Sequence, residues 1–461
     1  MAMAFTALGV VATSCVTTSG LAGGPEPTTD ASADTSPVNP NPCGKDLPND
    51  PGNCGTCGNA CSFGANSFPL CTAGVCKIGC NTQYGNCDNN DKNGCESILA
   101  GDPLNCNACG RDCGGGKCSA GQCGPVSLTP KVDAGQADGF PLSLGQDATS
   151  LFYGWRSNTN STYDLVKLDK ATGAVLVLAS DPTYYYAEFL TADADPNGFV
   201  YFGRSYTQLF PIGGPYTSAD GAVLKVSKMG GPSAVSIFAG TALGTAGGLF
   251  VDSNTRIVAT ATGIFFSVFG FSPTIGGGVF KCPVTGTCPS PVQLAASGNQ
   301  YGIISLAVDE TAFAFNNAQT AAVYTCPLAG CPASPTQVQA TTSARLMFED
   351  AANYYWINQY NSSIVKVDRG TNVATVLASG QTNPYGLAID DKNVYWTNAG
   401  SSGNVSACAI ALADGGAGSG CGGNPSLLAQ NVNQPYSVVV DAKAVYWSTQ
   451  ISGGGIFKLV K

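Results

Sequence analysis

From residue 124 onward the chain is a succession of short apolar runs separated by Gly, Asn, Asp and Ser. One pattern recurs: an apolar run, an aspartate, three residues, and then a triplet of apolar or aromatic residues. Its clearest copies place Asp390 before Val394-Tyr395-Trp396 and Asp441 before Val445-Tyr446-Trp447. Short apolar runs bounded by turn-forming residues are typical of β-strands. Each copy therefore predicts two antiparallel strands joined by a tight turn that contains the aspartate.

Seven copies of this pattern follow one another along the chain. They are headed by Asp147, Asp195, Asp252, Asp309, Asp350, Asp390 and Asp441. Two further β-type runs follow the triplet, for example Ile364–Val367 and Ala374–Ala378 after Trp356. Four strands in about 40–50 residues form one propeller blade. The sequence therefore predicts an all-β fold in which residues 124–461 form a seven-bladed β-propeller, or a six-bladed one if the weak Asp252 copy belongs to an insertion.

The two ends of this domain predict how the propeller closes. The last run, Gly455–Val460, is a third strand without a fourth, and Pro125–Leu128 is a strand without a repeat of its own. Pairing the two would hide an open sheet edge. Six cysteines straddle turns between third and fourth strands and are disulfide candidates in three pairs: Cys282 with Cys288, Cys326 with Cys331, and Cys408 with Cys421.

Residues 43–123 form a cysteine-rich module with an internal duplication. The spacing C-x10-C-x2-C-x3-C begins at Cys43 and again at Cys95, and the segment around Cys54 repeats around Cys106. Large apolar side chains are too sparse here for a self-supporting core, so small domains of this kind depend on cross-links. We expect disulfides, with zinc as the less favoured alternative because each unit holds one C-x2-C. The spacing leaves the disulfide connectivity open.

The N-terminal 42 residues have the composition of an export leader and a tether. Residues 1–15 contain a short apolar run that ends at Ala12-Thr13-Ser14-Cys15, which resembles a bacterial lipobox with Cys15 as the lipidated residue. The alternative is an ordinary cleaved signal peptide in which Cys15 is lost or idle. Residues 16–42 are rich in Thr, Ser, Pro, Gly and Ala and predict a disordered linker. We therefore expect an exported protein, anchored at the outer membrane or released, that meets a membrane only through a lipid anchor.

Composition narrows the chemistry further. The chain has 21 Lys and Arg, 30 Asp and Glu and a net charge of −9, which argues against a nucleic-acid partner. It contains no histidine, and this excludes histidine-activated nucleophiles, histidine general bases and the usual catalytic zinc sites. No cofactor is expected. Carboxylate chemistry and calcium binding stay possible.

The segment from Asn86 to Glu96 is a weak candidate for calcium. Asn89, Asp91 and Asn93, followed by Gly94, have the alternate oxygen ligands of an EF-hand-like loop. The twelfth position is Ala100, where such a loop needs a bidentate Glu. A polar turn held by disulfides is the favoured interpretation.

The motif Tyr395-Trp396-Thr397-Asn398, preceded by Pro384–Asp390, resembles the YWTD and NHL-like β-propellers. The whole layout is similar to predicted surface lipoproteins of some large-genome Gram-negative bacteria, which join a cysteine-rich stalk to such a propeller. The resemblance covers nearly all of residues 43–461. The Thr-Asp ending of the motif is replaced here by Thr397-Asn398, Ile357-Asn358 and Ser448-Thr449. The resemblance therefore implies the fold and the surface location, and no particular ligand.

Propeller ligands usually meet the rim formed by loops that enter the first strand and leave the second. Weak candidates on this rim are Arg156, Arg204, Tyr206, Asn358, Tyr360, Asn383, Tyr385, Gln434 and Tyr436. Flat aromatic rings with neutral amides suit sugars or extended peptides. The repeated aspartates are expected to hold turns, and the Tyr and Trp residues of the triplets to form the core between blades.

These features favour a non-catalytic binding or adhesion protein that contacts polysaccharide or protein, and they include no catalytic residues. One alternative is a glycan-active enzyme that uses carboxylates, for which Glu188 is the plausible acid, although no partner acid stands out. Another alternative is a purely structural envelope protein.

Overall fold

The computed structural model describes residues 43, 46–128, 139–156, 163–181, 187–191, 198–204, 222–230, 235–238, 249–250, 256–270, 278–296, 303–341, 343–410, 421 and 424–461. These residues form strands and turns, and among them no helix is long and apolar enough to cross a membrane. The leader, the linker and Cys15 lie outside the described residues. The chain divides into two compact units: Met1–Ser62 with Pro69–Lys77, and Phe63–Phe68 with Ile78–Lys461.

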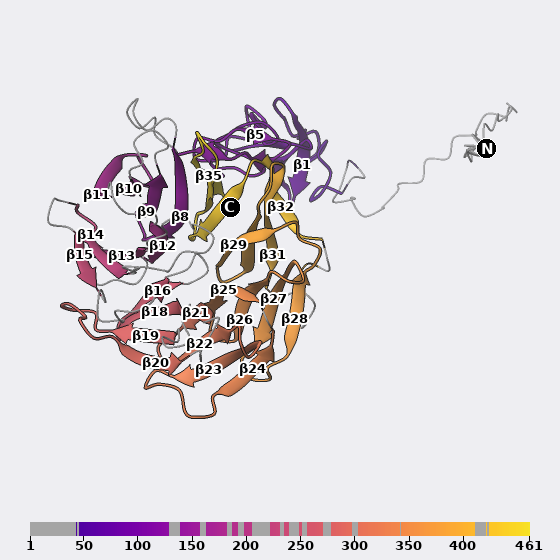
Figure 1. Cartoon of the computed structure of the whole chain (residues 1–461). Helices are drawn as coiled ribbons and strands as arrows, with labels where there is room; N and C mark the ends of the chain where they lie inside the picture. Colours follow the sequence, from indigo (N-terminus) through magenta and orange to yellow (C-terminus); the bar gives the residue numbers. More distant parts are fainter. Residues whose placement is uncertain are drawn as a thin grey trace, which may run out of the picture. The chain divides into compact units, whose positions relative to one another are not determined.

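The larger unit is a β-propeller in which successive sheets follow one another in chain order (Figure 1). Six of its sheets are four-stranded and antiparallel, and we number them as blades one to six. Blade one comprises β8 (Phe140–Gln146), β9 (Ser150–Arg156), β10 (Tyr163–Asp169) and β11 (Val175–Asp181). Blade two comprises β12 (Ala187–Thr191), β13 (Phe199–Arg204), β14 (Ala222–Ser227) and β15 (Val235–Phe238). Blade three comprises β21 (Ile303–Val308), β22 (Ala312–Asn317), β23 (Ala322–Pro327) and β24 (Thr336–Ala340).

Blades four to six complete the regular set. Blade four comprises β25 (Ala344–Glu349), β26 (Asn353–Asn358), β27 (Ser363–Asp368) and β28 (Ala374–Ala378). Blade five comprises β29 (Pro384–Ile389), β30 (Asn393–Asn398), β31 (Gly403–Ala409) and β32 (Ser426–Val432). Blade six comprises β33 (Pro435–Val440), β34 (Ala444–Thr449), β35 (Ile456–Val460) and β7 (Val126–Ser127).

The sheet between blades two and three breaks the four-stranded pattern. It has five strands: β16 (Leu249–Phe250), β17 (Ile257–Thr260), β18 (Gly263–Gly270), β19 (Gly278–Cys282) and β20 (Val292–Ala296). Both β16 and β17 pair with β18, so two short segments stand where the other sheets have one inner strand. The prediction of seven equivalent four-stranded blades is therefore not supported. Six blades are regular. The irregular sheet lies in the segment headed by Asp252, the copy for which the sequence allowed six blades as the alternative.

Blade six closes with a strand from the other end of the domain, as predicted. Phe457 pairs with Ser127 and Lys458 with Val126, and the Leu128 N–H donates to the Ile456 carbonyl at 2.8 Å. The outer edge of β35 is thus covered, and the last blade has its fourth strand. Three disulfides, Cys282–Cys288, Cys326–Cys331 and Cys408–Cys421, link the end of a third strand to the connection that follows it.

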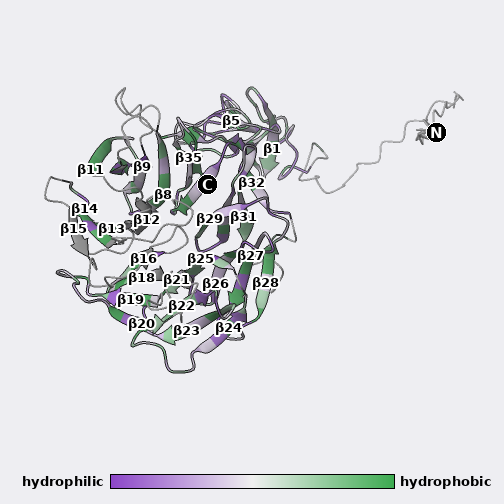
Figure 2. Ribbon diagram, viewed as in Figure 1, coloured by the Kyte–Doolittle hydropathy of each residue, from purple (hydrophilic) through white to green (hydrophobic). Residues whose placement is uncertain are grey.

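The core lies between neighbouring blades, where the aromatic triplets pack. Trp396 and Tyr355 belong to one cluster across blades four and five, and Trp447 and Tyr395 to another across blades five and six. The three triplet tryptophans are at most 1% exposed. Figure 2 shows hydrophobic residues concentrated on sheet strands such as β11 and β28. Burying each large side chain contributes about 1.5–3 kcal/mol, so this apolar stacking is the main force that holds the blades together.

The cysteine-rich residues have little regular structure and many cross-links. Their strands are β1 (Ser67–Thr72), β2 (Val75–Cys80), β3 (Tyr84–Gly85), β4 (Ser97–Ile98), β5 (Cys118–Ser119) and β6 (Gln122–Cys123), in two-stranded sheets β1-β2, β3-β4 and β5-β6. The seven disulfides are Cys43–Cys57, Cys54–Cys71, Cys61–Cys76, Cys80–Cys95, Cys87–Cys109, Cys106–Cys118 and Cys113–Cys123. Phe63, Phe68, Leu70 and Val75 are between 39% and 59% exposed, so cross-links replace a core here.

The duplication is visible in the bonding. Asp50 and Asp102 each accept a hydrogen bond from the N–H two residues on, at 2.9 Å in both cases. Cys54–Cys71 and Cys61–Cys76 recur as Cys106–Cys118 and Cys113–Cys123. The repeated spacing misleads at one point: Cys95 matches Cys43 by spacing, yet the bond equivalent to Cys43–Cys57 is made by Cys87 to Cys109.

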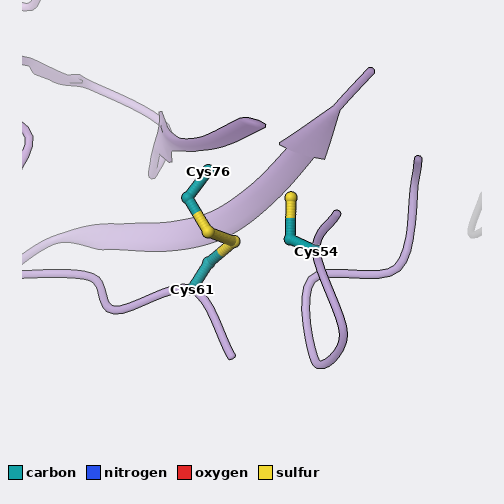
Figure 3. A group of neighbouring side chains, drawn as sticks. All are labelled: Cys54, Cys61 and Cys76. Atoms are coloured by element: carbon teal, nitrogen blue, oxygen red, sulfur yellow. A yellow bond between two sulfur atoms is a disulfide. The ribbon is translucent and has the colours of Figure 1, made fainter. Parts of the chain in front are cut away.

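Two groups of cysteine sulfurs lie within 4.8 Å of one another, Cys54 with Cys61 and Cys76, and Cys106 with Cys113 and Cys123. Figure 3 shows the first group, with the Cys54 sulfur beside the Cys61–Cys76 disulfide. A metal binds thiolates, and every cysteine in both groups is oxidised. These groups are stacked disulfides, which argues against the zinc alternative.

Candidate functional site

Each regular blade has two ends with different chemistry. At the turn end, the first strand turns into the second through the repeated aspartate. At the entry end, the first strand begins and the second strand ends.

At the turn end, the aspartate side chain closes the turn that carries it. Asp350 Oδ1 accepts hydrogen bonds from the N–H groups of Ala352 at 2.7 Å and Asn353 at 2.6 Å. The same pair of bonds, from the second and third residues on, is made by Asp147, Asp309, Asp390 and Asp441. The structural role predicted for these aspartates is confirmed for these five, whereas Asp195 and Asp252 lie outside the described residues.

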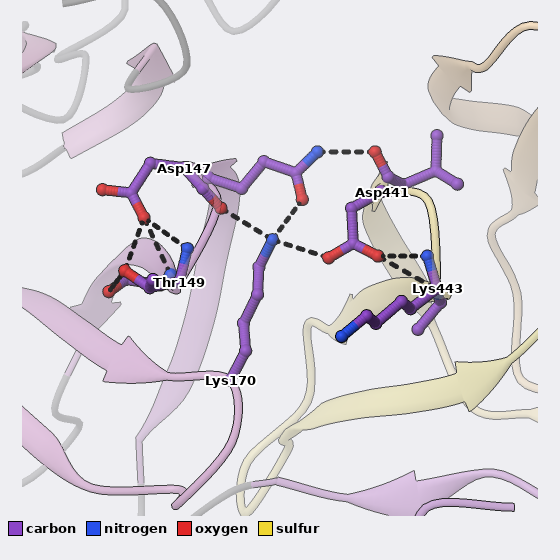
Figure 4. Close-up of polar contacts among 9 residues, drawn as sticks. Asp147, Thr149, Lys170, Asp441 and Lys443 are labelled. Carbon is purple, nitrogen blue, oxygen red and sulfur yellow. Dashed lines mark hydrogen bonds and ion pairs between the residues drawn. The ribbon is translucent and has the colours of Figure 1, made fainter. Parts of the chain in front are cut away.

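The second carboxylate oxygen joins neighbouring blades. Lys170 of blade one donates to Asp441 Oδ2 of blade six at 2.9 Å, and also to Gln146 Oε1 and the Asp147 carbonyl (Figure 4). Three equivalent ion pairs, each from the residue after the third strand to the aspartate of the preceding blade, are Lys228–Asp147, Arg369–Asp309 and Lys461–Asp390. We call these four contacts the interblade clamps.

The clamps explain the electrostatics of these carboxyls. Burial alone would raise the pKa of Asp309. The N–H groups of Thr311 and Ala312 and the Arg369 guanidinium outweigh burial and lower that pKa to about 2. The pKa values of Asp147, Asp390 and Asp441 are lowered in the same way. A carboxylate held by this many donors is poorly suited to serve as a catalytic base.

Glu349 is the exception at the turn end. Burial raises its pKa to about 7, opposed by Arg256 and reinforced by Asp309. Arg256 Nη1 lies 3.5 Å from Glu349 Oε2 and donates to the Met347 carbonyl at 3.2 Å. A perturbed carboxyl is a catalytic candidate only where a substrate can reach it. Glu349 is packed inside a cation cluster and fits a structural role.

The calcium candidates belong to a loop that bonds to itself. Asp91 Oδ1 accepts from Asn86 Nδ2 at 2.8 Å, Asn93 Nδ2 donates to Asp88 Oδ2 at 2.8 Å, and Asn89 has φ of 58°. Carboxylate oxygens of Asp88 and Asp91 are thus engaged by neighbouring amides of the same loop. The loop geometry supports the polar-turn interpretation.

At the entry end, the inner strands of blades four, five and six carry a contiguous group. The residue five before each turn aspartate is Arg345 in β25, Tyr385 in β29 and Tyr436 in β33. In all three strands the register shifts just after the start, which marks a β-bulge. The same shift recurs in β8, β12 and β21, so this β-bulge is a feature of the repeat.

These three side chains form one stack, the Arg345–Tyr385–Tyr436 stack. The Arg345 guanidinium carbon lies 4.1 Å from the Tyr385 ring centroid, and the Tyr385 and Tyr436 centroids are 4.2 Å apart. The Tyr385 hydroxyl donates to the Tyr436 hydroxyl at 2.8 Å. Gly386 permits this approach, because a Cβ there would lie 2.5 Å from the Tyr436 carbonyl oxygen. Arg345 is 5% and Tyr436 6% exposed, while Tyr385 is half-buried.

The stack modifies the expectation of a flat aromatic rim. Tyr385 comes from the middle blade, with Arg345 on one side and Tyr436 on the other, so neither face of its ring is open. Tyr360, in the loop after β26, is 84% exposed and is the described rim aromatic best placed to offer a free ring.

The other rim candidates have mostly structural contacts. Asn358 Oδ1 accepts from the Asn361 N–H at 3.1 Å, and the Arg156 guanidinium lies over the Phe140 ring at 5.6 Å. Asn383 and Gln434 are exposed, and both have positive φ values, of 54° and 47°. Tyr206 lies outside the described residues. The side chains of Arg204, in β13, and Glu188, in β12, are also not described.

Arg345 is the residue that sequence reasoning missed. Its position five before Asp350 was visible, and alignment with Tyr385 and Tyr436 on the turn aspartate would have placed it beside them. The residue type alone does not indicate a site, because Arg is common on exposed strands.

No family model matches this chain, and no curated protein is significantly similar to it. Similar solved structures include a streptogramin B lyase, 10% identical over 73% of this chain and 97% of that chain, with a TM-score of 0.47. A puromycin-hydrolyzing peptidase of Mycobacterium tuberculosis is 12% identical over 74% of this chain and 53% of that chain, with a TM-score of 0.48. A chain of a nidogen–laminin complex is 15% identical over 50% and 82%, with a TM-score of 0.35. These likenesses concern the propeller and assign no activity.

Proposed function

We propose that this protein is an exported, non-catalytic binding protein that contacts polysaccharide or protein through the entry end of its propeller. The observation that carries the proposal is the Arg345–Tyr385–Tyr436 stack, which gathers one cation and two phenols at one position of three adjacent inner strands. Buried polar and aromatic groups on rigid strands are the usual parts of a recognition site.

The disulfides support the export part of this proposal. Ten disulfides join all the cysteines that the structure describes, which suits an oxidising compartment outside the cytoplasm. Lipidation of Cys15, followed by the polar segment 16–42, would hold the folded part away from a membrane surface.

Two observations disfavour the enzymatic alternative. The chain has no histidine, and five turn aspartates are engaged by backbone N–H groups. An envelope protein with no ligand remains the competing proposal, and it predicts that entry-end substitutions leave every binding assay unchanged.

The test is a glycan array combined with pull-down from envelope-protein extracts, using the full oxidised chain. Saturable binding is expected, and we expect it to weaken at least tenfold in Tyr385→Ala and Tyr360→Ala. Lys392→Ala, at the turn end, is the control and should bind like the unaltered protein. Absence of any binding by a folded sample would refute the proposal in favour of the structural alternative.

A further inference from the structure

The charge of Arg345 is not balanced by anything else the structure describes. Its side chain is 5% exposed, its Nε is buried without a hydrogen-bond partner, and no described acid lies within ion-pair distance. Its recorded contact is the Tyr385 ring at 4.1 Å. This combination is unusual, because buried charges in proteins are normally paired.

Comparison with the other described arginines makes the point sharper. Arg369 pairs with Asp309, Arg256 lies 3.5 Å from Glu349, and Arg111 donates to the carbonyls of Cys106 and Gly121. Arg156 has an interaction partner as well. Arg345 is more buried than these four arginines and has no oxygen partner among the described atoms.

Arginine cannot avoid the cost of burying an unpaired charge by losing its proton, because its pKa lies too high. The cation–π contact with Tyr385 offsets only part of the cost of removing the guanidinium from water. The folded state therefore retains a buried Nε–H without an acceptor, in a guanidinium whose planar fork matches a carboxylate.

We propose that the entry end of blades four to six binds the carboxylate of an acidic polysaccharide, with Arg345 as the anion-binding residue. This rests on the proposed binding function and names its ligand class. The half-buried Tyr385 hydroxyl, which donates to the Tyr436 hydroxyl at 2.8 Å, lies within the same stack and can still accept a hydrogen bond from a sugar hydroxyl.

The neighbouring surface favours a sugar over an acidic peptide. The Gln359 N–H donates to the Ser343 carbonyl at 3.3 Å, which ties the loop that carries Tyr360 to the chain two residues before Arg345. Tyr360 is 84% exposed and can stack on a pyranose ring. The net charge of −9 repels polyanions at long range, so the recognition must be local and not driven by overall charge.

The experiment is isothermal titration of the full oxidised chain with an oligomer of galacturonic acid and with the methyl ester of the same oligomer. Methyl esterification removes the carboxylate charge of each residue and adds one methyl group, while the sugar backbone stays the same. We expect the acid to bind and the ester to bind at least tenfold more weakly. Arg345→Gln should weaken binding of the acid at least tenfold, and Arg345→Lys, which keeps the charge without the fork, should give an intermediate loss. Arg111→Gln is the matched control, with the same change of charge and unchanged binding.

Several results would overturn the proposal. Equal binding of acid and ester would refute recognition of a carboxylate but leave the proposed binding function intact. Unchanged affinity in Arg345→Gln would have the same meaning. Equal, Arg345-dependent binding of poly-glutamate would replace the polysaccharide by an acidic polypeptide. Binding of neither oligomer would refute this ligand class, and the array described above then decides separately whether the protein binds anything. Arg345→Gln should unfold at the same temperature as the unaltered protein, so that a loss of binding is not a loss of folding.

Discussion

The two ends of the propeller blades use the same residue types in opposite ways. At the turn end, Asp309 accepts from two backbone N–H groups and is paired with Arg369 of the next blade. At the entry end, Arg345 is more deeply buried than Arg369, and among the described residues its side-chain partner is the face of Tyr385. The interblade clamps pair their charges within the fold, whereas Arg345 has no ion-pair partner among the described residues.

This difference separates stability from function within one repeat. A clamp that recurs at four blade junctions, at the same place in the repeat, stabilises the ring. Arg345 occurs once, where blades five and six have tyrosine, and has no clamp-like partner among the described residues, so we infer that its charge serves a ligand. The predictions below test that separation, beginning with the largest expected effect.

Replacing a turn aspartate should be the most damaging single change. Asp390→Ala leaves the N–H groups of Lys392 and Asn393, the Tyr395 hydroxyl and Lys461 without their acceptor. We expect a loss of about 3 kcal/mol in the free energy of unfolding, measured by urea titration with disulfides intact. Asp391→Ala, at the exposed neighbouring position, should change it by less than about 0.5 kcal/mol. Equal effects would contradict the assigned role of the turn aspartate.

The two ends can be compared directly with two arginine substitutions. Arg369→Met removes the partner of Asp309 and of the Asp350 carbonyl, and should cost about 2 kcal/mol. Arg345→Met removes a buried charge that has no oxygen partner among the described residues, and should cost nothing or stabilise the ligand-free protein. The measurement is the free energy of unfolding of each variant. If Arg345→Met lowered the free energy of unfolding as much as Arg369→Met does, Arg345 would already have a partner within the protein.

Stability should depend on pH with opposite signs for two carboxyls at the turn end. The lowered pKa of Asp309, about 2, means that its contribution is present above pH 4 and is lost as pH falls towards 2. The raised pKa of Glu349, about 7, favours its protonated form, so stability falls as pH rises from about 4.5 through 7. Melting temperatures of Asp309→Asn and Glu349→Gln should each lack the corresponding slope. A slope unchanged in Glu349→Gln would mean that another group causes it.

The smallest effect is expected where a clamp is missing. Ile410 occupies the clamp position of blade five, since its N–H donates to the Lys392 carbonyl as that of Lys461 donates to the Lys443 carbonyl. Ile410→Lys should reach Asp350 of blade four and be more stable than Ile410→Met by about 0.5 kcal/mol at low salt. The difference should vanish in 1 M salt. A difference that persists at high salt would argue against an ion pair.

Local chemistry was predictable from the sequence, and contacts between repeats were not. The Asp-containing turns, the buried triplets and the pairing of Val126 with β35 follow from turn preference, alternation and an unpaired strand. The irregular sheet at β16–β20 and the bonding of Cys87 in place of Cys95 depend on tertiary packing that spacing does not reveal. The clamps join residues of different blades, so no window of sequence contains both partners, and the Arg345 stack emerges only when the repeats are aligned on the turn aspartate.

Hydrogen exchange with and without the bound oligogalacturonate tests most directly that recognition belongs to the entry end. We expect slower exchange at the starts of β25, β29 and β33 and in the loop around Tyr360, with no change at the turns headed by Asp350, Asp390 and Asp441. Protection confined to the turn end, or spread evenly over both ends, would contradict the division between a stabilising and a binding end.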